Sequence, residues 1–381
     1  MSKINIRNLC NENEDGAPTI VGVSTFSATS YMCPPKGTTA QRPENPVSGS
    51  IRFNTDTASL EYYKGNTIGW TQIEMTSPDL DGGVRGIAMG GETPSSPNGS
   101  ATIDYFTIST LGNGQDFGDL TQSRGTAGAC ASRTRGLCMS GYEGGYHNVI
   151  DYITISSTGN ALDFGDLPVA VQGVGALSDA TRAVMTSGSN ASPGITNVLS
   201  YVTIATTGNP QDFGDQQRSS SYSGTCSSST RGILAGGYGP AAPTISNTIE
   251  YLTIATTGNT SDFGDMNGVR IGAMGVSNST RGVFGGGLSP TFLNNIEYLT
   301  IATLGDTIDF GDLINSRYMR SSGMASPTRG LFQGGSTSPG TNRVDNVDYI
   351  EFATTGNSLD FGNLTQGMSA IPGCSNGHGG L

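Results

Sequence analysis

Hydrophobic and polar residues alternate over short stretches of the chain, and each stretch is bounded by residues typical of turns. In residues 231–280, an apolar run at 233–235 ends in two glycines and leads into a loop rich in Gly, Pro and Ser. Residues 248–256, TIEYLTIAT, then alternate with period two, which places Tyr251 and Leu252 on opposite faces of a predicted strand. Tyr and β-branched residues dominate this stretch, as is typical of strands.

The rest of this unit predicts further strands and no helix. The tripeptide Thr257-Gly258-Asn259 predicts a turn, because Gly and Asn both tolerate positive φ. Phe263 anchors a short outer strand after this turn, and residues 271–276 begin the next unit. We therefore expect four short strands in each unit of about 49 residues.

A DFGD-like motif follows each alternating strand. It occurs six times, at spacings of 47, 49, 50, 47 and 51 residues, so it marks a structural repeat. In protein kinases the DFG aspartate binds a catalytic magnesium ion, but a catalytic motif occurs once and the other kinase motifs are missing from this sequence. We interpret the Asp as capping a turn, the Phe as filling the seam between units and the Gly as allowing the next bend. The six aspartates are Asp116, Asp163, Asp212, Asp262, Asp309 and Asp360.

Two more residues recur with the same period, an arginine that opens the apolar strand and a tyrosine in the alternating strand. Six copies of a four-stranded antiparallel unit predict an all-β fold, a six-bladed β-propeller over residues 79–381. The first copy lacks the strand before its arginine, and residues 365–381 match that strand, so we expect a C-terminal strand to close the ring. We interpret the arginines as structural. They are Arg85, Arg135, Arg182, Arg231, Arg281 and Arg329, and the tyrosines are Tyr105, Tyr152, Tyr201, Tyr251, Tyr298 and Tyr349.

Composition and charge narrow the possible functions. Glycine makes up 57 of 381 residues and charged residues only 13%, which suits short strands joined by tight turns. The net charge is −12, and the 19 Lys and Arg residues form no basic patch, which argues against nucleic-acid binding. We expect the scattered acids to serve solubility, with an acidic calcium site as the alternative. No stretch resembles a signal peptide or contains 18 consecutive apolar residues, so we expect synthesis in the cytoplasm and no membrane insertion.

The six cysteines predict neither disulfides nor a metal site. Three of them, Cys130, Cys226 and Cys374, fall at one position of the repeat, so we expect them to act as small buried apolar residues. No CxxC or other metal-ligand spacing is present, and we expect no cofactor and no metal. The other copies carry Leu177, Val276 and Met324 at that position, and the other cysteines are Cys10, Cys33 and Cys138.

Residues before the repeats divide into an extended arm at 1–36 and a small β module at 37–78. The sequence SIRFNTDTASLEYY predicts a hairpin of two strands around a turn at 54–57. The sequence KGNTIGW predicts a second turn, and we expect Trp70, the only tryptophan, to cap a small hydrophobic cluster. The proline-rich RPENP predicts a rigid lead-in.

This module closely resembles one common in phage virion proteins, especially tail-fibre and structural proteins of cyanophages. The resemblance implies a virion protein, made in the host cytoplasm, that docks on the particle through its N-terminal region and displays the propeller. The repeats, with a doubled glycine, a tyrosine strand and an aromatic residue, resemble the kelch repeat, with Phe in place of the usual Trp. The matching residues are Arg42, Pro43, Asn45, Pro46, Gly49, residues 51–57 and 60–63, Gly65 and Trp70. The expected docking residues are Arg42, Phe53, Asp56, Tyr62, Tyr63 and Trp70.

The copies differ most between the doubled glycine and the tyrosine strand. Equivalent loops join equivalent strands, so we expect all of these loops on one face of the propeller, where a rigid scaffold would present a binding surface. The alternative is that their side chains pack locally or against another virion protein. The candidate binding residues are Tyr142, Tyr146, His147, Tyr238, Phe292 and Arg343.

Three function classes remain open at this point. The first is an appendage that recognises a host surface glycan or protein. The second is a structural connector or decoration that contacts only other proteins of the capsid, tail or fibre, and in both classes we expect a homo-oligomer in the particle. The third, a depolymerase, is disfavoured because the two histidines, His147 and His378, have no evident catalytic partners, so we assign no catalytic residues.

Overall fold

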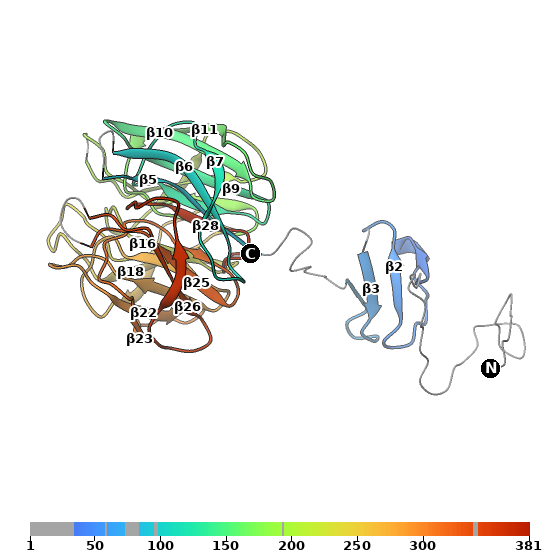
Figure 1. Ribbon diagram of the computed structural model, residues 1–381. Helices are drawn as coiled ribbons and strands as arrows, with labels where there is room; N and C mark the ends of the chain where they lie inside the picture. The colour runs from blue at the N-terminus through green and yellow to red at the C-terminus, as the bar shows by residue number, and fades with distance from the viewer. Residues whose placement is uncertain (1–33, 58, 73–83, 95–97, 193, 338–341) are drawn as a thin grey trace, which may run out of the picture. The chain divides into compact units, whose positions relative to one another are not determined.

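The computed structural model describes residues 34–57, 59–72, 84–94, 98–192, 194–337 and 342–381. The chain divides into two compact units, Met1–Ser77 and Pro78–Leu381, which we describe separately. Both consist of strands, and the single helical element in the described ranges is the 3-10 turn η1 (Thr39–Gln41). The fold is therefore all-β, as the sequence predicts (Figure 1).

The N-terminal unit contains one four-stranded sheet in the order β1-β2-β3-β4. Turns at 55–57 and 66–68 connect its last three strands, which confirms the hairpin and the second turn. Lys36 pairs in parallel with Phe53, so the end of the predicted arm belongs to this sheet, whereas the rest of the arm at 1–33 lies outside the described residues. The strands are β1 (Lys36–Gly37), β2 (Ile51–Asn54), β3 (Ser59–Tyr63) and β4 (Trp70–Gln72).

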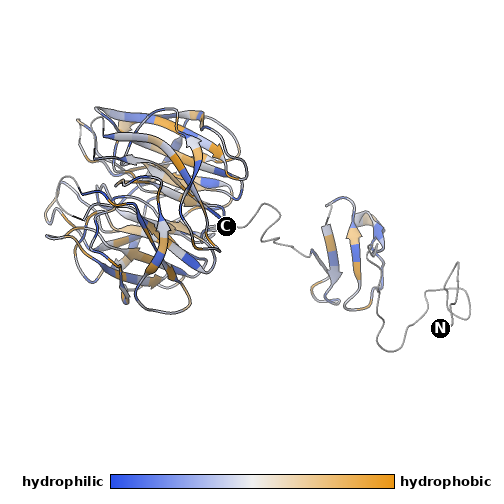
Figure 2. Cartoon of the chain, in the orientation of Figure 1, coloured by the Kyte–Doolittle hydropathy of each residue, from blue (hydrophilic) through white to orange (hydrophobic). Residues whose placement is uncertain are grey.

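The larger unit is a propeller-like arrangement of four-stranded antiparallel sheets, six of them in its described part. Figure 2 shows hydrophobic residues on many of the strands in this unit. Sheet 1 contains β28 (Gly373–Ser375), β5 (Arg85–Glu92), β6 (Gly99–Thr107) and β7 (Gln115–Asp119). Sheet 2 contains β8 (Gly128–Ala131), β9 (Arg135–Tyr142), β10 (Tyr146–Thr154) and β11 (Leu162–Val171). Sheet 3 contains β12 (Ala176–Ser178), β13 (Arg182–Met185), β14 (Val198–Thr203) and β15 (Gln211–Asp215).

The other three sheets follow the same strand order. Sheet 4 contains β16 (Gly224–Ser227), β17 (Arg231–Ala235), β18 (Thr248–Thr253) and β19 (Ser261–Asp265). Sheet 5 contains β20 (Met274–Ser277), β21 (Arg281–Gly285), β22 (Asn295–Thr300) and β23 (Ile308–Asp312). Sheet 6 contains β24 (Met324–Ala325), β25 (Arg329–Gln333), β26 (Asn346–Glu351) and β27 (Leu359–Asn363).

The alternating strand is shorter than its pattern predicts. In sheet 4, β18 ends at Thr253, and the chain turns at 254–256, where the Thr256 N–H donates to the Thr253 carbonyl (3.3 Å). Glu250 and Leu252 are both buried, as is their neighbour Ile249, because sheet 4 packs against sheet 3 on one face and sheet 5 on the other. Alternation therefore separates two buried faces here rather than a buried face from an exposed one.

Each repeated arginine joins two sheets. The Arg231 guanidinium lies 4.9 Å from the centroid of the Tyr251 ring and donates a hydrogen bond to the Ile301 carbonyl of sheet 5 (3.0 Å). The Tyr251 ring in turn meets Phe263 edge to face, with the centroids 6.0 Å apart. The structural role predicted for the arginines is confirmed, since the other five sheets repeat both contacts. The remaining arginine–carbonyl pairs are Arg85–Ile155, Arg135–Ile204, Arg182–Ile254, Arg281–Phe352 and Arg329–Ile108.

The tripeptide predicted as a turn is instead a bridge to the preceding sheet. The Gly258 N–H donates to the Phe213 carbonyl of sheet 3 (2.7 Å), and the Asn259 side chain accepts the Asp215 N–H (3.0 Å). This approach is so close that a Cβ on Gly214, whose φ is +141°, would lie 2.5 Å from the Gly258 carbonyl oxygen. The DFGD motif therefore needs glycine for two reasons, the positive φ of this residue and the close approach of the neighbouring backbone, which leaves no room for a Cβ.

The motif's other residues show one correct and one wrong prediction. Phe263 is 2% exposed and packs in a cluster with residues of sheets 4 and 5, so the seam role is confirmed. The turn-capping role of the aspartate is wrong: Asp262 is exposed, and its carboxylate accepts no hydrogen bond from the described part of the chain. The motif instead acts as a donor: the backbone N–H of its second aspartate, Asp215 in the third copy, donates to the Asn259 side chain of the next sheet.

The first strands of the sheets surround a narrow cavity of about 40 Å³. The cysteine prediction is confirmed, because Cys130, Cys226 and Cys374 occupy equivalent register positions on these strands and are buried free thiols. Burial raises the pKa of Cys130 to about 12, which keeps it protonated and unreactive. His378 lines the same cavity, where the Gly380 N–H donates to its Nδ1 (3.0 Å) and its Nε2 lies 2.8 Å from the Ala131 carbonyl oxygen.

The C-terminal strand pairs with the first sheet. Cys374 of β28 lies opposite Ile87 of β5 in an antiparallel register. Sheet 6 also contacts sheet 1, because the Asn363 N–H donates to the Asn113 side chain (3.1 Å) in the same way that Asp215 does to Asn259.

Replacing Phe263 with Ala should lower the free energy of unfolding by about 3–5 kcal/mol, the usual cost of emptying a buried Phe site. Urea unfolding followed by far-ultraviolet circular dichroism measures this change. The exposed neighbour provides the control, since Asp262→Asn should leave the midpoint nearly unchanged. Equal midpoints for Phe263→Ala and the wild type would contradict the seam role.

Candidate binding surface

The loops that differ between copies gather at one end of their sheets. Each joins the second and third strands, and each forms a β-bridge with the segment that enters the same sheet from the preceding one, as Tyr238 does with Ser221. These bridges fix the loops to the scaffold. We call this set the variable-loop surface; its described members lie within residues 93–98, 143–145, 186–197, 236–247, 286–294 and 334–345, together with the bridged segments and the strand ends that flank them.

Three of the predicted binding residues lie together on sheet 2. The rings of Tyr142 and Tyr146 meet edge to face with centroids 5.4 Å apart, and Tyr142 is 39% exposed. His147 Nδ1 lies 2.9 Å from the Gln122 side-chain oxygen. Partial burial and the nearby Arg124 lower the pKa of His147, so this side chain is neutral at pH 7. Tyr238 on sheet 4 stands apart from them and is 40% exposed.

Arg343 does not lie free on the surface. Its side chain is 10% exposed, and its guanidinium forms an ion pair with Glu92 (2.9 Å) and donates to the Ser369 hydroxyl (3.0 Å). Glu92 also pairs with Arg320 (2.5 Å), so one carboxylate of sheet 1 holds two arginines of other segments. The interpretation of Arg343 as an exposed contact residue is therefore replaced by an internal ionic role.

Phe292 belongs to a second aromatic group that sequence reasoning missed. Its ring lies 6.3 Å from that of Tyr318, and the Arg320 guanidinium lies 5.0 Å from the Tyr318 centroid. Burial raises the pKa of Tyr318 to about 12 and also raises that of Tyr222. Both tyrosines are therefore protonated hydrogen-bond donors at neutral pH.

Two residues near this aromatic group, Tyr222 and Arg320, have an unusual backbone conformation. Tyr222 and Arg320 have φ values of +58° and +64°, at a repeat position where Gly173 and Gly272 stand in other copies. The Tyr222 N–H donates to the Gly173 carbonyl (2.8 Å), so these segments are joined from sheet to sheet. Large side chains at a position that otherwise favours glycine are a signal that an alignment of the six copies could have shown.

The chemistry of this surface suits binding. Aromatic faces, tyrosine hydroxyls and paired charges are groups that recognise sugars and proteins. Among the described residues, no group of three or more His, Cys, Asp or Glu side chains is arranged to hold a metal ion. The described part of the chain also contains no helix long and apolar enough to span a membrane.

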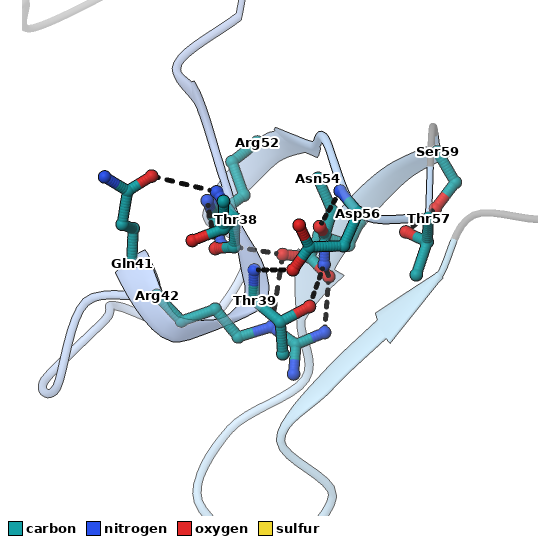
Figure 3. A network of polar contacts seen from close by, with 10 residues as sticks. Thr38, Thr39, Gln41, Arg42, Arg52, Asn54, Asp56, Thr57 and Ser59 are labelled. Carbon is teal, nitrogen blue, oxygen red and sulfur yellow. Dashed lines mark hydrogen bonds and ion pairs between the residues drawn. The ribbon is translucent and has the colours of Figure 1, made fainter.

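The N-terminal unit is held by a buried ionic network, shown in Figure 3. Glu61 is fully buried and pairs with Arg42 (2.6 Å) and with Arg52 (2.9 Å), and it accepts a further hydrogen bond from Asn54 (3.2 Å). The hydrogen bond from Arg42 lowers the pKa of Glu61 despite its burial, and the same contact raises the pKa of Arg42.

Four of the six expected docking residues make contacts that hold this unit together. Arg42 pairs with Glu61, and Asp56 accepts the Thr39 N–H (2.8 Å). Tyr63 is buried, donates to the Asn66 side chain and packs at 5.4 Å from the Trp70 ring. The other two, Phe53 and Tyr62, lie on the opposite face of the sheet and are partly exposed. Of the six, only Tyr63 is buried; Asp56 is exposed, and Phe53 and Tyr62 present the face that the ionic network does not use.

Comparison with known proteins adds no relative. The chain matches no model of a protein family, and no curated protein matches it.

Acidification should destabilise the N-terminal unit. Because the folded-state pKa of Glu61 lies below its unfolded value, its stabilising contribution is complete above that unfolded value, about 4.3, and is lost as pH falls through the folded pKa. Trp70 is the only tryptophan, so urea unfolding followed by its fluorescence reports on this unit in the full chain. We expect the urea concentration at the midpoint of unfolding to be lower at pH 3 than at pH 7.

The variants Glu61→Gln and Glu44→Gln test the assignment. Glu61→Gln should lower the midpoint at pH 7 and flatten its acid dependence, because the titrating group of the network is gone. Glu44 is exposed in the same unit, so Glu44→Gln should keep the wild-type profile. An unchanged acid profile in Glu61→Gln would show that another group controls this unit.

Proposed function

We propose that this chain is a non-enzymatic structural protein of a phage virion that displays a closed, six-bladed kelch-like propeller for recognition of a host-surface glycan or protein. One observation carries the proposal: the repeated residues are used in contacts between sheets, whereas the residues that differ between copies gather at one end. A conserved frame with variable loops is the usual construction of a binding protein.

Closure of the ring is inferred from three kinds of contact. The C-terminal β28 pairs with β5, the Arg329 guanidinium donates to the Ile108 carbonyl (3.3 Å), and Asn363 donates to Asn113. The strand pairing has an equivalent within each other sheet, and the other two contacts have equivalents between the other neighbouring sheets, so we infer that sheet 6 meets sheet 1 as any blade meets the next.

Attachment to the particle is assigned to the N-terminal unit, on its resemblance to the phage module. The partly exposed face with Phe53 and Tyr62 is the surface that we expect to contact another virion protein. Ile51 extends this face and is 53% exposed. The larger unit is then free to present its variable-loop surface.

A connector that contacts only other virion proteins is the second candidate, and one observation favours it. Sheets 2, 5 and 6 expose a large apolar residue at the start of the fourth strand, and the turns at Leu111 and Leu304 add two more. Exposed apolar residues on neighbouring sheets are common at permanent interfaces. The three strand residues are Leu162, Ile308 and Leu359, each 58–59% exposed.

Adsorption of the purified full chain separates the two candidates. Receptor recognition predicts saturable binding to cells that the particle infects. Binding to particles with no adsorption to such cells would support the connector and overturn the receptor role. A cryo-electron microscopy map of the particle then tests the virion assignment itself.

Replacing Tyr142 and Tyr238 together with Ala should weaken cell adsorption by about tenfold or more, since a tyrosine anchor contributes roughly 1–2 kcal/mol or more to an interface. Both side chains are about 40% exposed, so the melting temperature should stay nearly the same. Ile308→Ser with Leu359→Ser is the matched control and should leave adsorption intact. The reverse pattern, with particle attachment lost only in the control, would favour the connector.

A further inference from the structure

A buried carboxylate is present at five of the six junctions between sheets. At the junction of sheets 1 and 2, Asp151 accepts the Thr121 N–H (3.0 Å) and pairs with the buried Arg124 (2.9 Å). Two other junctions repeat the ion pair, and two keep the carboxylate without an arginine. The other acids and their N–H donors are Glu250 and Gln217, Glu297 and Asn267, Asp348 and Ile314, and Asp104 and Thr365, at 2.9–3.1 Å.

The junction of sheets 2 and 3 has lost every part of this network. Ser200 stands in place of the carboxylate, because it pairs with Met185 and Asp212 as Asp151 pairs with Cys138 and Asp163. Val171 stands in place of the arginine, five residues after Asp166 as Arg124 is after Asp119.

The hydrogen-bond donor of the network is absent as well. Pro168 occupies the position of Thr121, and proline has no N–H to donate. The carboxylate, the arginine and the N–H donor are therefore replaced together, by Ser200, Val171 and Pro168. No member of the network is left buried without a partner. The result is a junction without a buried carboxylate, whereas each of the other five has one.

A pocket of about 220 Å³ opens at this junction. Two of the residues that line the pocket, Val169 and Val198, are 52% and 46% exposed, so the pocket is accessible from solvent. The described residues that line it include no charged side chain. Its apolar lining is Leu167, Pro168, Val169, Val171, Val174, Met185 and Val198, with Ser187, Asn190, Thr196 and Ser200 among its polar members.

We propose that this pocket binds a neutral aromatic or branched aliphatic group, between benzene and indole in size. An apolar cavity of about 150 Å³ is enough to bind benzene, so the volume here suffices. The absence of a charged side chain in the described lining disfavours an ionic ligand, which would lose its hydration without a partner. The Ser200 and Thr196 hydroxyls lie in the same lining and supply hydrogen bonds to one polar atom of the ligand.

This inference does not depend on the proposed function. The pocket shares loop 186–197 with the variable-loop surface, but its binding of a small apolar group is a separate property from adsorption to cells. Either can fail without the other, since pocket binding is measured on the isolated full chain and adsorption is measured on cells.

Titration with indole and with toluene, followed by methyl NMR of the full chain, tests the proposal. We expect saturable shifts confined to Val171, Val174, Met185 and Val198. Shifts elsewhere only, or none at millimolar probe, would overturn it. Because this readout needs no variant, it decides the question even where substitutions disturb folding.

Rebuilding the ionic network should abolish binding. The triple variant Pro168→Thr, Val171→Arg and Ser200→Asp restores the residues of the first junction and fills the pocket with an ion pair. We expect binding to weaken by at least about tenfold while the sheets still pack. Ser200→Leu fills the pocket without charge and should have the same effect, and Val269→Thr, at an exposed site of the ionic junction of sheets 4 and 5, should bind as the wild type does. Wild-type affinity in both filled variants would contradict the assignment.

Discussion

The larger unit depends on one repeated contact, in which an arginine stacks on the tyrosine of its own sheet and donates to a carbonyl of the next. The tyrosine ring in turn meets a buried phenylalanine edge to face, so each sheet contains one stack of arginine, tyrosine and phenylalanine. The tyrosine of one sheet and a backbone carbonyl of the next both contact the guanidinium, so its position depends on two sheets at once. Since each sheet has two apolar faces and four short strands, none could bury its surface alone. The contact therefore couples the sheets as much as it stabilises any of them.

The sequence predicts those parts of the fold that depend on repetition. Phe263 and Cys130 were placed correctly because six copies reveal a buried position even where the residue type changes. The prediction of a turn at the Thr-Gly-Asn tripeptide is wrong, because its residues favour a turn locally whereas its hydrogen bonds to Phe213 and Asp215 exist only between sheets. The candidate site shows the same limit. Arg343 has the composition of a surface contact, and only its distance to Glu92 reveals an ion pair. Ser200 and Val171 are unremarkable in the sequence and become informative only because the fold places both in the lining of one pocket.

The two units solve the problem of stability in different ways. The larger one stacks apolar faces, whereas the N-terminal sheet has Glu61 at its centre, with two arginines and an asparagine around it. A sheet of so few residues cannot bury enough apolar area to be held by that area alone. An ionic centre demands a defined geometry from every partner, because an unpaired charge there would be costly. That requirement explains why several residues that match the phage module serve the interior of this unit.

The pairing of β28 with β5 has a consequence for how the chain is made. Three strands of sheet 1 are among the first synthesised in the larger unit, yet their fourth partner follows every other strand in the sequence. Until it arrives, β5 presents an open edge that any compatible strand can occupy. At high local concentration, the competitor that fits best is the same segment of a second chain, because it offers an identical register. Exchange of this strand between copies is therefore the misassembly to which the architecture is most exposed, and rapid intramolecular capture of β28 protects against it.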